Sequence, residues 1–410
     1  MARNASAEIR RRPKDRKAQI ARAAAEAFSE QGYHGVSMEA IAARVGVSAA
    51  ALYRHYAGKY ELFRGAVLGL GRQLVDGTAD LNVTDDEDPR QQFDALVGAL
   101  VDVALANRTS GGLYRWEGRY LDDADQAELL AQIGAVHDRL HRPLARLRPG
   151  LTRRQYLTLS TAVLSVVGSI VDHRVKLPAA SVRELLIELA GAVAAVELPG
   201  EPAPAESPAA SPAPAPDPST YEALLRESLI LFHRHGYRDT SMEDIAAAVG
   251  IPASGIYKYF SGKADILAAV FRRASDRVSG GLAAVVASAA DPHEALSGVI
   301  DSYVARTFDQ PELEYVYYTE RLNMSAADQR IVHDLQRSVV ESWVELVVAV
   351  RPQWSRAQAR FAVHAAMALV IDLGRLQRYP DTEQARAVVR RLVEAVLLGD
   401  YRLRATFTPM

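Results

Sequence analysis

Apolar residues recur at helical spacing along nearly the whole of this 410-residue chain. No stretch alternates apolar and polar positions in the manner of a half-buried strand, so we expect an all-α protein. Two runs interrupt the helical pattern, a polar one at residues 82–89 and a proline-rich one at residues 199–218. Apart from a first helix near residues 15–31 and the repeated segment described next, the spacing predicts helices at residues 90–107, 113–121, 125–147, 152–175, 181–197, 293–308, 312–324, 326–350, 355–378 and 382–398.

One segment of the chain occurs twice. Residues 37–59 and 241–263 align without a gap at a displacement of 204 positions. Beyond residue 89 the two halves still align, now displaced by 203, so that Tyr114 corresponds to Tyr317. We conclude that one unit, half of the chain long, is duplicated as a block.

Each copy of the segment is typical of two short helices joined by a tight turn. Ser37 is suited to cap the first helix, and Gly46 supplies the positive φ that ends it. Ser48 then caps a second helix over residues 49–56, whereas Pro252 stands at that position in the second copy. This is helix-turn-helix spacing, in which the second helix enters the major groove of DNA. The alternative is a pair of helical hairpins that merely pack together.

The segment and its surroundings resemble the DNA-binding module of TetR-family transcriptional regulators. The resemblance depends on Phe28, Gly32-Tyr33, the run S-M-E-x-I-A and the run L-Y-R-H-Y-x-x-K. The second copy repeats these features as Phe232, Gly236-Tyr237, S-M-E-D-I-A and I-Y-K-Y-F-x-x-K. Two modules in one chain are similar to the tandem type of the family, as in the mycobacterial repressors of mammalian-cell-entry operons for lipid uptake.

The resemblance also implies which residues contact DNA. They are Ser37, Ser48, Ala49, Tyr53, Arg54, His55 and Lys59 in the first copy, and Ser241, Ala253, Ser254, Tyr257, Lys258, Tyr259 and Lys263 in the second. The tyrosines at 53 and 257 can reach a phosphate or a thymine methyl, and the lysines at 59 and 263 would lie beside phosphates. Because several of these residues differ between the copies, we expect a double-stranded DNA operator that is not a palindrome.

The net charge of −2 does not by itself indicate a nucleic-acid-binding protein. DNA affinity depends on where the positive charge lies more than on its sum. A basic cluster stands at the start of the chain and consists of Arg10, Arg11, Arg12, Lys14, Arg16 and Lys17. We interpret it as a set of phosphate contacts, and a solubilising tail is the alternative.

These features divide the chain into six segments. They are a basic arm at 1–14, a first helix-turn-helix domain at 15–81, a first helical body at 89–197, a Pro/Ala-rich linker at 198–219, a second helix-turn-helix domain at 220–284 and a second body at 292–400. Eight prolines in the linker favour an extended spacer of ~3.1 Å per residue. Such a spacer is long enough to connect the first body to the second helix-turn-helix domain. The two helix-turn-helix domains are called heads below.

Two heads in one chain indicate an intramolecular pseudo-dimer, because helix-turn-helix proteins usually bind DNA as symmetric dimers. In the resembled family the last two helices of each body form a four-helix bundle. The equivalent stripes are Leu159, Ala162, Val163, Val166 and Ile170 in the first half, and Ala362, Ala365, Ala366, Leu369 and Leu373 in the second. Large residues align with small ones at Leu159/Ala362, which favours packing between unlike halves. Ordinary core is the alternative for these stripes.

The resemblance further implies that the bodies enclose a small apolar effector of the lipid, sterol or acyl-thioester type. The residues that could line such a site are Tyr317, Tyr318, Met324, Trp343, Phe361, His364 and Met367 in the second half, and Trp116 and Tyr120 in the first. We expect the second half to bind more readily. Each of these residues could instead be plain core.

Several function classes are disfavoured. The absence of cysteine excludes disulfides and thiolate sites, and no apolar run reaches the ~20 residues of a membrane span. His137 and His141 are four apart, but no third metal ligand can be assigned, and no phosphate-binding loop is present. We expect no cofactor, no catalysis and a cytoplasmic location. The favoured interpretation is an effector-released repressor, monomeric on DNA, and the alternative is a carrier or enzyme with vestigial heads.

Overall fold

The computed structural model describes residues 13–81, 87–198, 219–380 and 382–399, with side chains from Arg16 onward. These residues form helices and connecting turns without any strand, which confirms the all-α prediction. Most of the predicted basic arm and most of the predicted linker lie outside the described residues. Of the basic cluster, Arg16 and Lys17 lie in the first helix, where the Arg16 guanidinium donates to the carbonyl of Val45.

The chain divides into two compact units. Unit 1 contains residues 1–80 and 103–136, and unit 2 contains residues 81–102 and 137–410. Unit 1 holds α1 (Pro13–Gly35), α2 (Met38–Val45), α3 (Ala49–Tyr53), α4 (Lys59–Gly77), α6 (Leu113–Trp116) and η1 (Gly118–Tyr120). Two long helices, α5 (Pro89–Ala106) and α7 (Asp123–Leu147), contribute residues to both units.

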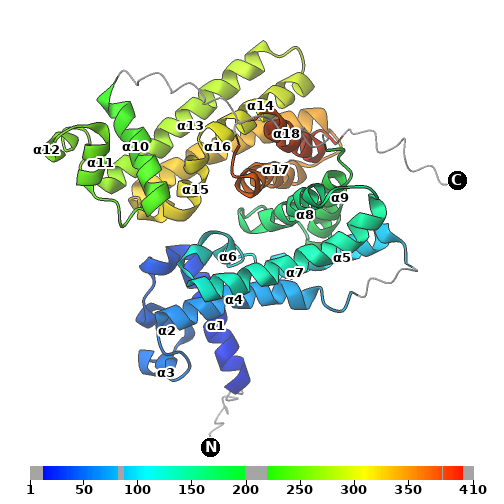
Figure 1. Cartoon of the computed structure of the whole chain (residues 1–410), viewed down its shortest axis with the longest axis horizontal. Coiled ribbons are helices and arrows are strands. Elements are labelled where there is room, and N and C mark those ends of the chain that lie inside the picture. Colours follow the sequence, from blue (N-terminus) through cyan, green and yellow to red (C-terminus); the bar gives the residue numbers. More distant parts are fainter. Residues whose placement is uncertain (1–12, 82–86, 199–218, 381, 400–410) are drawn as a thin grey trace, which may run out of the picture. The chain divides into compact units, whose positions relative to one another are not determined.

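Unit 2 holds the rest of the first half and the whole of the second (Figure 1). From the first half come α8 (Arg153–Gly168), η2 (Ser169–Val171) and α9 (Ala179–Ala194). From the second come α10 (Thr220–His235), α11 (Met242–Val249), α12 (Ala253–Ile256), α13 (Lys263–Ser288), α14 (Pro292–Asp309), α15 (Pro311–Glu320), η3 (Arg321–Asn323), α16 (Ala326–Val350), α17 (Arg356–Gln377) and α18 (Glu383–Leu397).

The second helix of each helix-turn-helix is shorter than its pattern suggested. We expected residues 49–56 to be helical, but α3 ends at Tyr53, and α12 spans only Ala253–Ile256. In both copies the chain leaves the helix in a turn that brings an aromatic residue, Tyr56 or Phe260, back into the core. The helical spacing of apolar residues therefore continues for one turn beyond the helix itself.

Each head shares a core with the nearest body helices. In the first half, Phe28, Leu52 and Phe63 of the head form one buried cluster with Leu113 and Leu121 of the body. The second half repeats the arrangement, with Phe232, Ile256 and Phe271 clustering with Val316 and Met324. A head therefore cannot tilt without disturbing apolar contacts with its own body.

The last helices of the two halves pack against one another within unit 2. Helix α8 contacts α17, and α9 contacts α18 (Figure 1). Leu159 and Val163 on α8 are fully buried, as are their small counterparts on α17. The hydroxyl of Ser165 donates to the carboxylate of Asp372 across this contact at 2.6 Å. These helices therefore form the interface of an intramolecular pseudo-dimer, as the stripes predicted.

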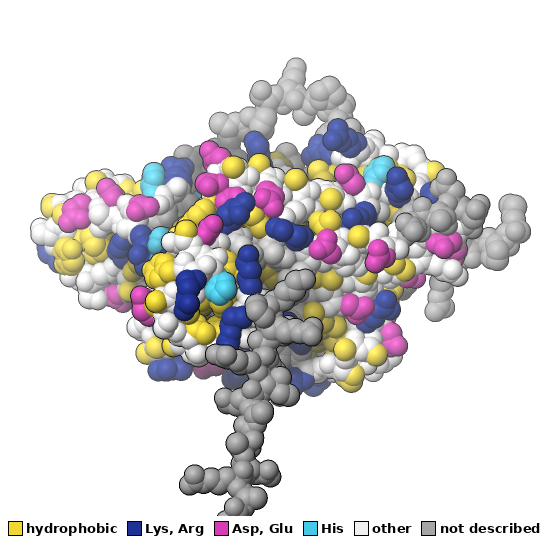
Figure 2. All heavy atoms as spheres, turned by 90° about the horizontal axis from the view of Figure 1, so that it is seen from below, with side chains coloured by type: hydrophobic (Ala, Val, Ile, Leu, Met, Phe, Trp, Pro, Cys, Tyr) yellow, Lys and Arg dark blue, Asp and Glu magenta, His cyan; other side chains and the backbone are white. Residues whose placement is uncertain are grey.

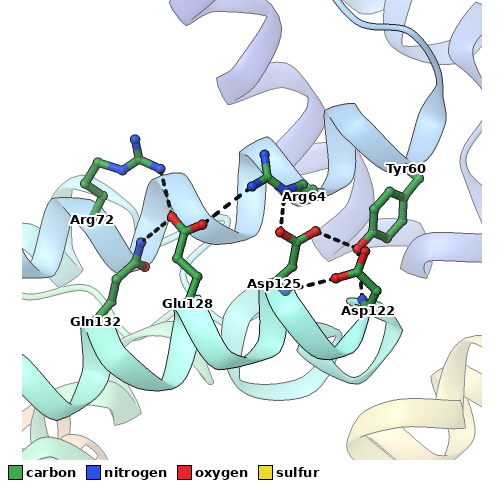
Figure 3. Close-up of polar contacts among 7 residues, drawn as sticks. All are labelled: Tyr60, Arg64, Arg72, Asp122, Asp125, Glu128 and Gln132. Carbon is green, nitrogen blue, oxygen red and sulfur yellow. Dashed lines mark hydrogen bonds and ion pairs between the residues drawn. The ribbon is translucent and has the colours of Figure 1, made fainter.

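A buried carboxylate fastens α4 to α7 in unit 1 (Figure 3). Asp125 accepts hydrogen bonds from the Tyr60 hydroxyl at 2.7 Å and from the Arg64 Nε at 2.5 Å. Burial alone would raise the pKa of Asp125, but these donors outweigh it, and the pKa is lowered. The second half keeps the carboxylate as Asp328 but moves its arginine one helical turn along α13, to Arg272.

We predict that Asp125→Asn lowers the free energy of unfolding by about 2 kcal/mol at pH 7, because it removes a charge-assisted hydrogen bond. The native pKa is depressed, so this stabilisation is present above the ordinary aspartate pKa of about 4 and is lost as the pH falls through the native pKa. Urea unfolding of wild type and variant should therefore differ at pH 7 and converge near pH 3. Asp123→Asn, at an exposed position, is the control, and an equal difference at both pH values would contradict the assignment.

Candidate nucleic-acid interface

Most residues expected to contact DNA lie on the surfaces of the two heads. Tyr53 is 51% exposed and Tyr257 is 55% exposed, so both rings are accessible to a partner. The exposed candidates are Ser37, Ser48, Tyr53, Arg54 and His55 in the first head and Ala253, Ser254, Tyr257, Lys258 and Tyr259 in the second. Ala49 and Ser241 are half-buried.

Core packing decides which side of each short helix faces outward. Leu52 and Tyr56 are buried in the first head, which leaves the three residues between them exposed. Ile256 and Phe260 are buried in the second head with the same result. Figure 2 looks onto the end of unit 1 with α1 to α3, where Lys, Arg and His side chains lie among hydrophobic ones. Such a mixture suits contact with both phosphates and thymine methyl groups.

The two motif lysines contact backbone carbonyls and a tyrosine ring within their own heads. The Lys59 ammonium donates to the carbonyl of Val36 at 3.0 Å and lies over the Tyr33 ring at 4.6 Å. Lys263 donates to the carbonyls of Tyr237, Arg238 and Thr240 and lies over the Tyr237 ring at 4.7 Å. Desolvation lowers the pKa of Lys263. Both side chains are half-buried and their ammonium groups contact the turn after the first helix, while contact with phosphate stays a prediction.

The heads differ at the start of the first helix of the motif. In α2 the Ser37 hydroxyl accepts from the Ala40 amide at 3.1 Å. In α11 Asp244 stands in place of alanine, and its carboxylate accepts from the Ser241 amide at 2.8 Å and from the Ser241 hydroxyl at 2.7 Å. These hydrogen bonds lower the pKa of Asp244. The second head therefore holds an exposed negative charge at a helix N-terminus, where a DNA phosphate would otherwise be favoured.

The second helices of the motifs also begin differently. The Ser48 hydroxyl accepts from the Ala51 amide at 3.3 Å and caps α3. Pro252 provides no side-chain cap to α12, which is four residues long and contains Gly255. The start of α12 therefore lacks the cap that Ser48 gives to α3, and the second head presents a shorter reading helix.

The residues expected to line an effector site fall into separate groups. Tyr317 and Met324 pack against the core of the second head, and Trp343 meets Tyr303 edge to face at 5.6 Å. Phe361 and His364 do not face the interior of the second body alone. Both rings contact His173 of the first half, each at 4.4 Å, so these two belong to the contact between the halves.

The remaining candidates lie apart from these. Tyr318 lies next to the Tyr317 ring at 5.3 Å, and Met367 is half-buried on α17. In the first half, Tyr120 stacks on Tyr33 of the head at 5.4 Å, and Trp116 is buried. Tyr120 therefore joins head to body.

A buried polar cluster in the second body was missed by the sequence analysis. Glu314 and Tyr303 lie close enough for each to act on the other, and burial raises the pKa of both groups. Arg306 lies over the Tyr303 ring at 5.2 Å, and its charge acts on Glu314. Tyr379 is close enough for the Glu314 charge to act on it, and its pKa is also raised, chiefly by burial. Comparison of the aligned halves would have found this cluster.

That comparison shows how different the two bodies are. At the positions of Tyr303, Arg306 and Glu314 the first half has Leu100, Val103 and Gly111. Aliphatic residues and glycine need no polar partner, whereas buried tyrosine and glutamate must be hydrogen bonded to be tolerated. Only the second half retains this costly cluster, and groups with shifted pKa values concentrate at functional sites.

Metal binding and membrane insertion receive no support from the described residues. No group of three potential metal-ligating side chains occurs in the part of the chain that the structure describes. His137 Nδ1 lies 2.8 Å from the Ser160 hydroxyl, and the His141 ring meets Tyr156 at 4.5 Å. Within the same ranges, every helix is too short or too polar to cross a bilayer.

Comparison with known proteins agrees with the two heads. The family model "Bacterial regulatory proteins, tetR family" matches residues 20–66 and again residues 224–270. The HTH-type transcriptional activator FasR of Mycolicibacterium smegmatis is 39% identical over 94 residues, which are 22% of this chain and 42% of FasR. The chain thus matches less than half the length of that relative.

Two solved structures are similar to about half of the chain. A TetR-family transcriptional regulator from Bordetella parapertussis has a TM-score of 0.39 at 18% identity, covering 44% of this chain and 95% of its own. The ketosteroid transcriptional regulator KstR2 of Mycobacterium tuberculosis has a TM-score of 0.39 at 20% identity, covering 45% and 95%. The family model thus matches both helix-turn-helix segments, so this chain contains two domains of the type found in bacterial regulatory proteins of the tetR family.

Proposed function

We propose that this protein is a transcriptional regulator whose two heads bind one operator together. The observation that supports this proposal most directly is the presence of two different tetR-type heads in a chain whose halves pair through α8, α9, α17 and α18. A conventional regulator of this class needs two chains to present two reading helices. One chain of this protein supplies both, so it acts as a monomer on DNA.

The contacts proposed to bind DNA are the exposed residues of both heads. Tyr53 and Tyr257 contact phosphate or thymine methyl groups, and Arg54 and Lys258 contact phosphates. The basic segment before α1 adds further phosphate contacts. We assign Lys59 and Lys263 to the support of the turn beside the motif, because backbone carbonyls hold their ammonium groups.

The regulator is proposed to act as a repressor that a small apolar molecule of the lipid, sterol or acyl-thioester type releases from DNA. The choice of repression over activation rests on the resemblance to tandem repressors of mammalian-cell-entry operons. FasR, which matches over 94 residues, is described as an activator. A reporter gene under the protein's own promoter, compared with and without the protein, distinguishes repression from activation.

We propose the second body as the effector site. The aromatic residues Tyr317, Tyr318 and Trp343 would contact the apolar part of the molecule, while Glu314 and Tyr303 would hydrogen bond its polar group. The first body has Gly111 and Leu100 at the aligned positions of this polar pair. It therefore serves the pairing of the halves rather than effector binding.

The proposed signal passes from effector to head through α15. Leu313 and Val316 on this helix belong to the core cluster of the second head, and Glu314 lies between them. An effector that binds Glu314 would displace α15 and with it the head. Coupling of about 1–3 kcal/mol is typical of such systems and is sufficient to release an operator.

The different-class alternative is a small-molecule carrier with vestigial heads. Electrophoretic mobility shift with DNA from the protein's own promoter region separates the two. A regulator should bind that DNA at nanomolar to micromolar concentration and prefer it to unrelated DNA. A carrier should show no sequence-specific shift at any salt concentration.

We predict that the operator is not a palindrome and that one chain occupies it. Different reading residues, such as His55 and Tyr259, should prefer different bases, with each mismatch costing about 1–3 kcal/mol. Two artificial palindromes, one from each natural half-site, should bind less tightly than the natural site in a titration that also measures stoichiometry. Equal affinity for all three, or two chains per minimal site, would contradict the pseudo-dimer.

We predict that Asp244→Ala raises operator affinity about fivefold, because removing the charge uncovers a helix N-terminus for phosphate and such contacts contribute ~1 kcal/mol. The log–log salt slope should become steeper by about one. The matched substitution in the first head, Ala40→Asp, should change both quantities in the opposite direction. Asp244→Asn keeps an acceptor for the Ser241 amide and isolates the effect of charge. Reduced or unchanged affinity of correctly folded Asp244→Ala would contradict the idea.

We predict that Glu314→Gln impairs release by effector but leaves operator affinity within about twofold, since the residue lies away from the exposed face of the head. The measurement is mobility shift in the presence of a sterol, a long-chain fatty acid or a long-chain acyl-coenzyme A. Trp116→Phe in the first body is the control and should respond like wild type. Normal release of Glu314→Gln by every compound that releases wild type would exclude Glu314 from the effector site.

A further inference from the structure

We propose that the surface formed by α8 and α9 selects the unlike surface formed by α17 and α18, so that a first half pairs with a second half and not with its own kind. The occupant of each surface is therefore the other half, in the same chain or in a second copy. This proposal concerns pairing alone and does not depend on DNA binding or on an effector.

The inference depends on the approximate twofold relation between the halves. Because aligned residues are 203 positions apart, every contact across the interface has a reciprocal contact on the other side of the axis. In a pair of like halves, the same two residues would instead meet on both sides of the axis. The residues at the reciprocal positions therefore show which contacts a pair of like halves would lose.

The first discriminating contact is the hydrogen bond from Ser165 to Asp372 at 2.6 Å. Its reciprocal positions are Ala368 and Ser169. Two second halves would place Ala368 opposite Asp372 on both sides, and alanine cannot donate to the carboxylate. Loss of a donor to a half-buried carboxylate is costly, so this contact opposes pairing of two second halves.

The second contact involves four charged residues. Arg351 pairs with Glu188 at 3.0 Å, while the reciprocal positions are Arg148 and Arg391. These two arginines both donate to carbonyls at the end of α9, Arg148 to Ala194 and Val196 and Arg391 to Glu197. The C-terminal end of a helix favours positive charge, which offsets the repulsion on that side. Two second halves would have an arginine pair on both sides and an ion pair on neither.

The third contact opposes pairing of two first halves. The buried His173 ring meets Phe361 edge to face and stacks on His364, both at 4.4 Å. The first half has Thr158 and Thr161 at the positions aligned with these two rings. Two first halves would replace the aromatic contacts with threonine side chains and leave less of the space filled. Loss of polar contacts therefore opposes pairing of two second halves, and loss of aromatic packing opposes pairing of two first halves.

The test uses the full chain with a protease site inserted in the linker at residues 199–218. Light and isotopically heavy samples are cleaved, mixed, denatured in urea, refolded and examined by native mass spectrometry. Random pairing would give equal amounts of like and unlike pairs. We expect unlike pairs to exceed like pairs at least about tenfold, with light and heavy halves exchanged. Comparable amounts of like pairs would overturn the proposal.

A gain-of-function variant tests the assigned residues directly. Ala368→Ser with Arg391→Glu transfers two first-half residues into the second half, so a pair of second halves regains both the donor to Asp372 and a partner for Arg351. This variant should form pairs of second halves that wild type lacks, while unlike pairing is retained. Ser302→Ala, at an exposed position on α14, is the control.

The mixing is also carried out without denaturant, by long incubation of cleaved native samples, so that the result does not depend on refolding. Stable unlike pairs that never yield like pairs support the proposal. Pairs of second halves in wild type, or their failure to increase in a variant that still forms unlike pairs, would overturn it.

Discussion

The packing of α8 and α9 against α17 and α18 is the contact on which the rest of the protein depends. It buries the apolar stripes that neither half could leave in water, and it allows one chain to present two DNA-binding heads. Hydrophobic burial alone would permit many pairings of these helices, because it has no direction. The choice of partner depends on a few polar contacts, among them the hydrogen bond from Ser165 to Asp372 and the ion pair of Arg351 with Glu188.

The two halves align over most of their length, yet they have different residues at aligned positions of the heads and bodies. The first half has Leu100 at the position aligned with Tyr303, and the N-terminus of its first motif helix is capped by Ser37 with Ala40 in place of an aspartate. The second half has the buried pair Tyr303 and Glu314 and a head whose equivalent N-terminus is occupied by Asp244. A conventional homodimer cannot divide its functions in this way, because each substitution would appear in both subunits.

The position of the motif lysines shows how the heads are kept rigid. Each ammonium group bridges the carbonyls of the turn between the first helix and the motif, and it lies over a tyrosine ring of the same turn. The turn must expose those carbonyls because it leaves the first helix through a glycine of positive φ, Gly32 or Gly236. The lysine that the family pattern suggested for DNA is therefore needed by the protein itself.

The sequence by itself determined the helical class, the duplication and most helix boundaries, since these follow from local spacing, capping residues and a displacement that can be counted. The resemblance to the family motif also named residues of the reading helices, most of which lie on the surface. Only the tertiary structure decided which side chains meet. His173 approaches Phe361 and His364 from the other half of the chain, and Glu314 meets Tyr303 from a neighbouring helix. Such contacts depend on how helices cross in space, and local sequence patterns contain no information about that crossing.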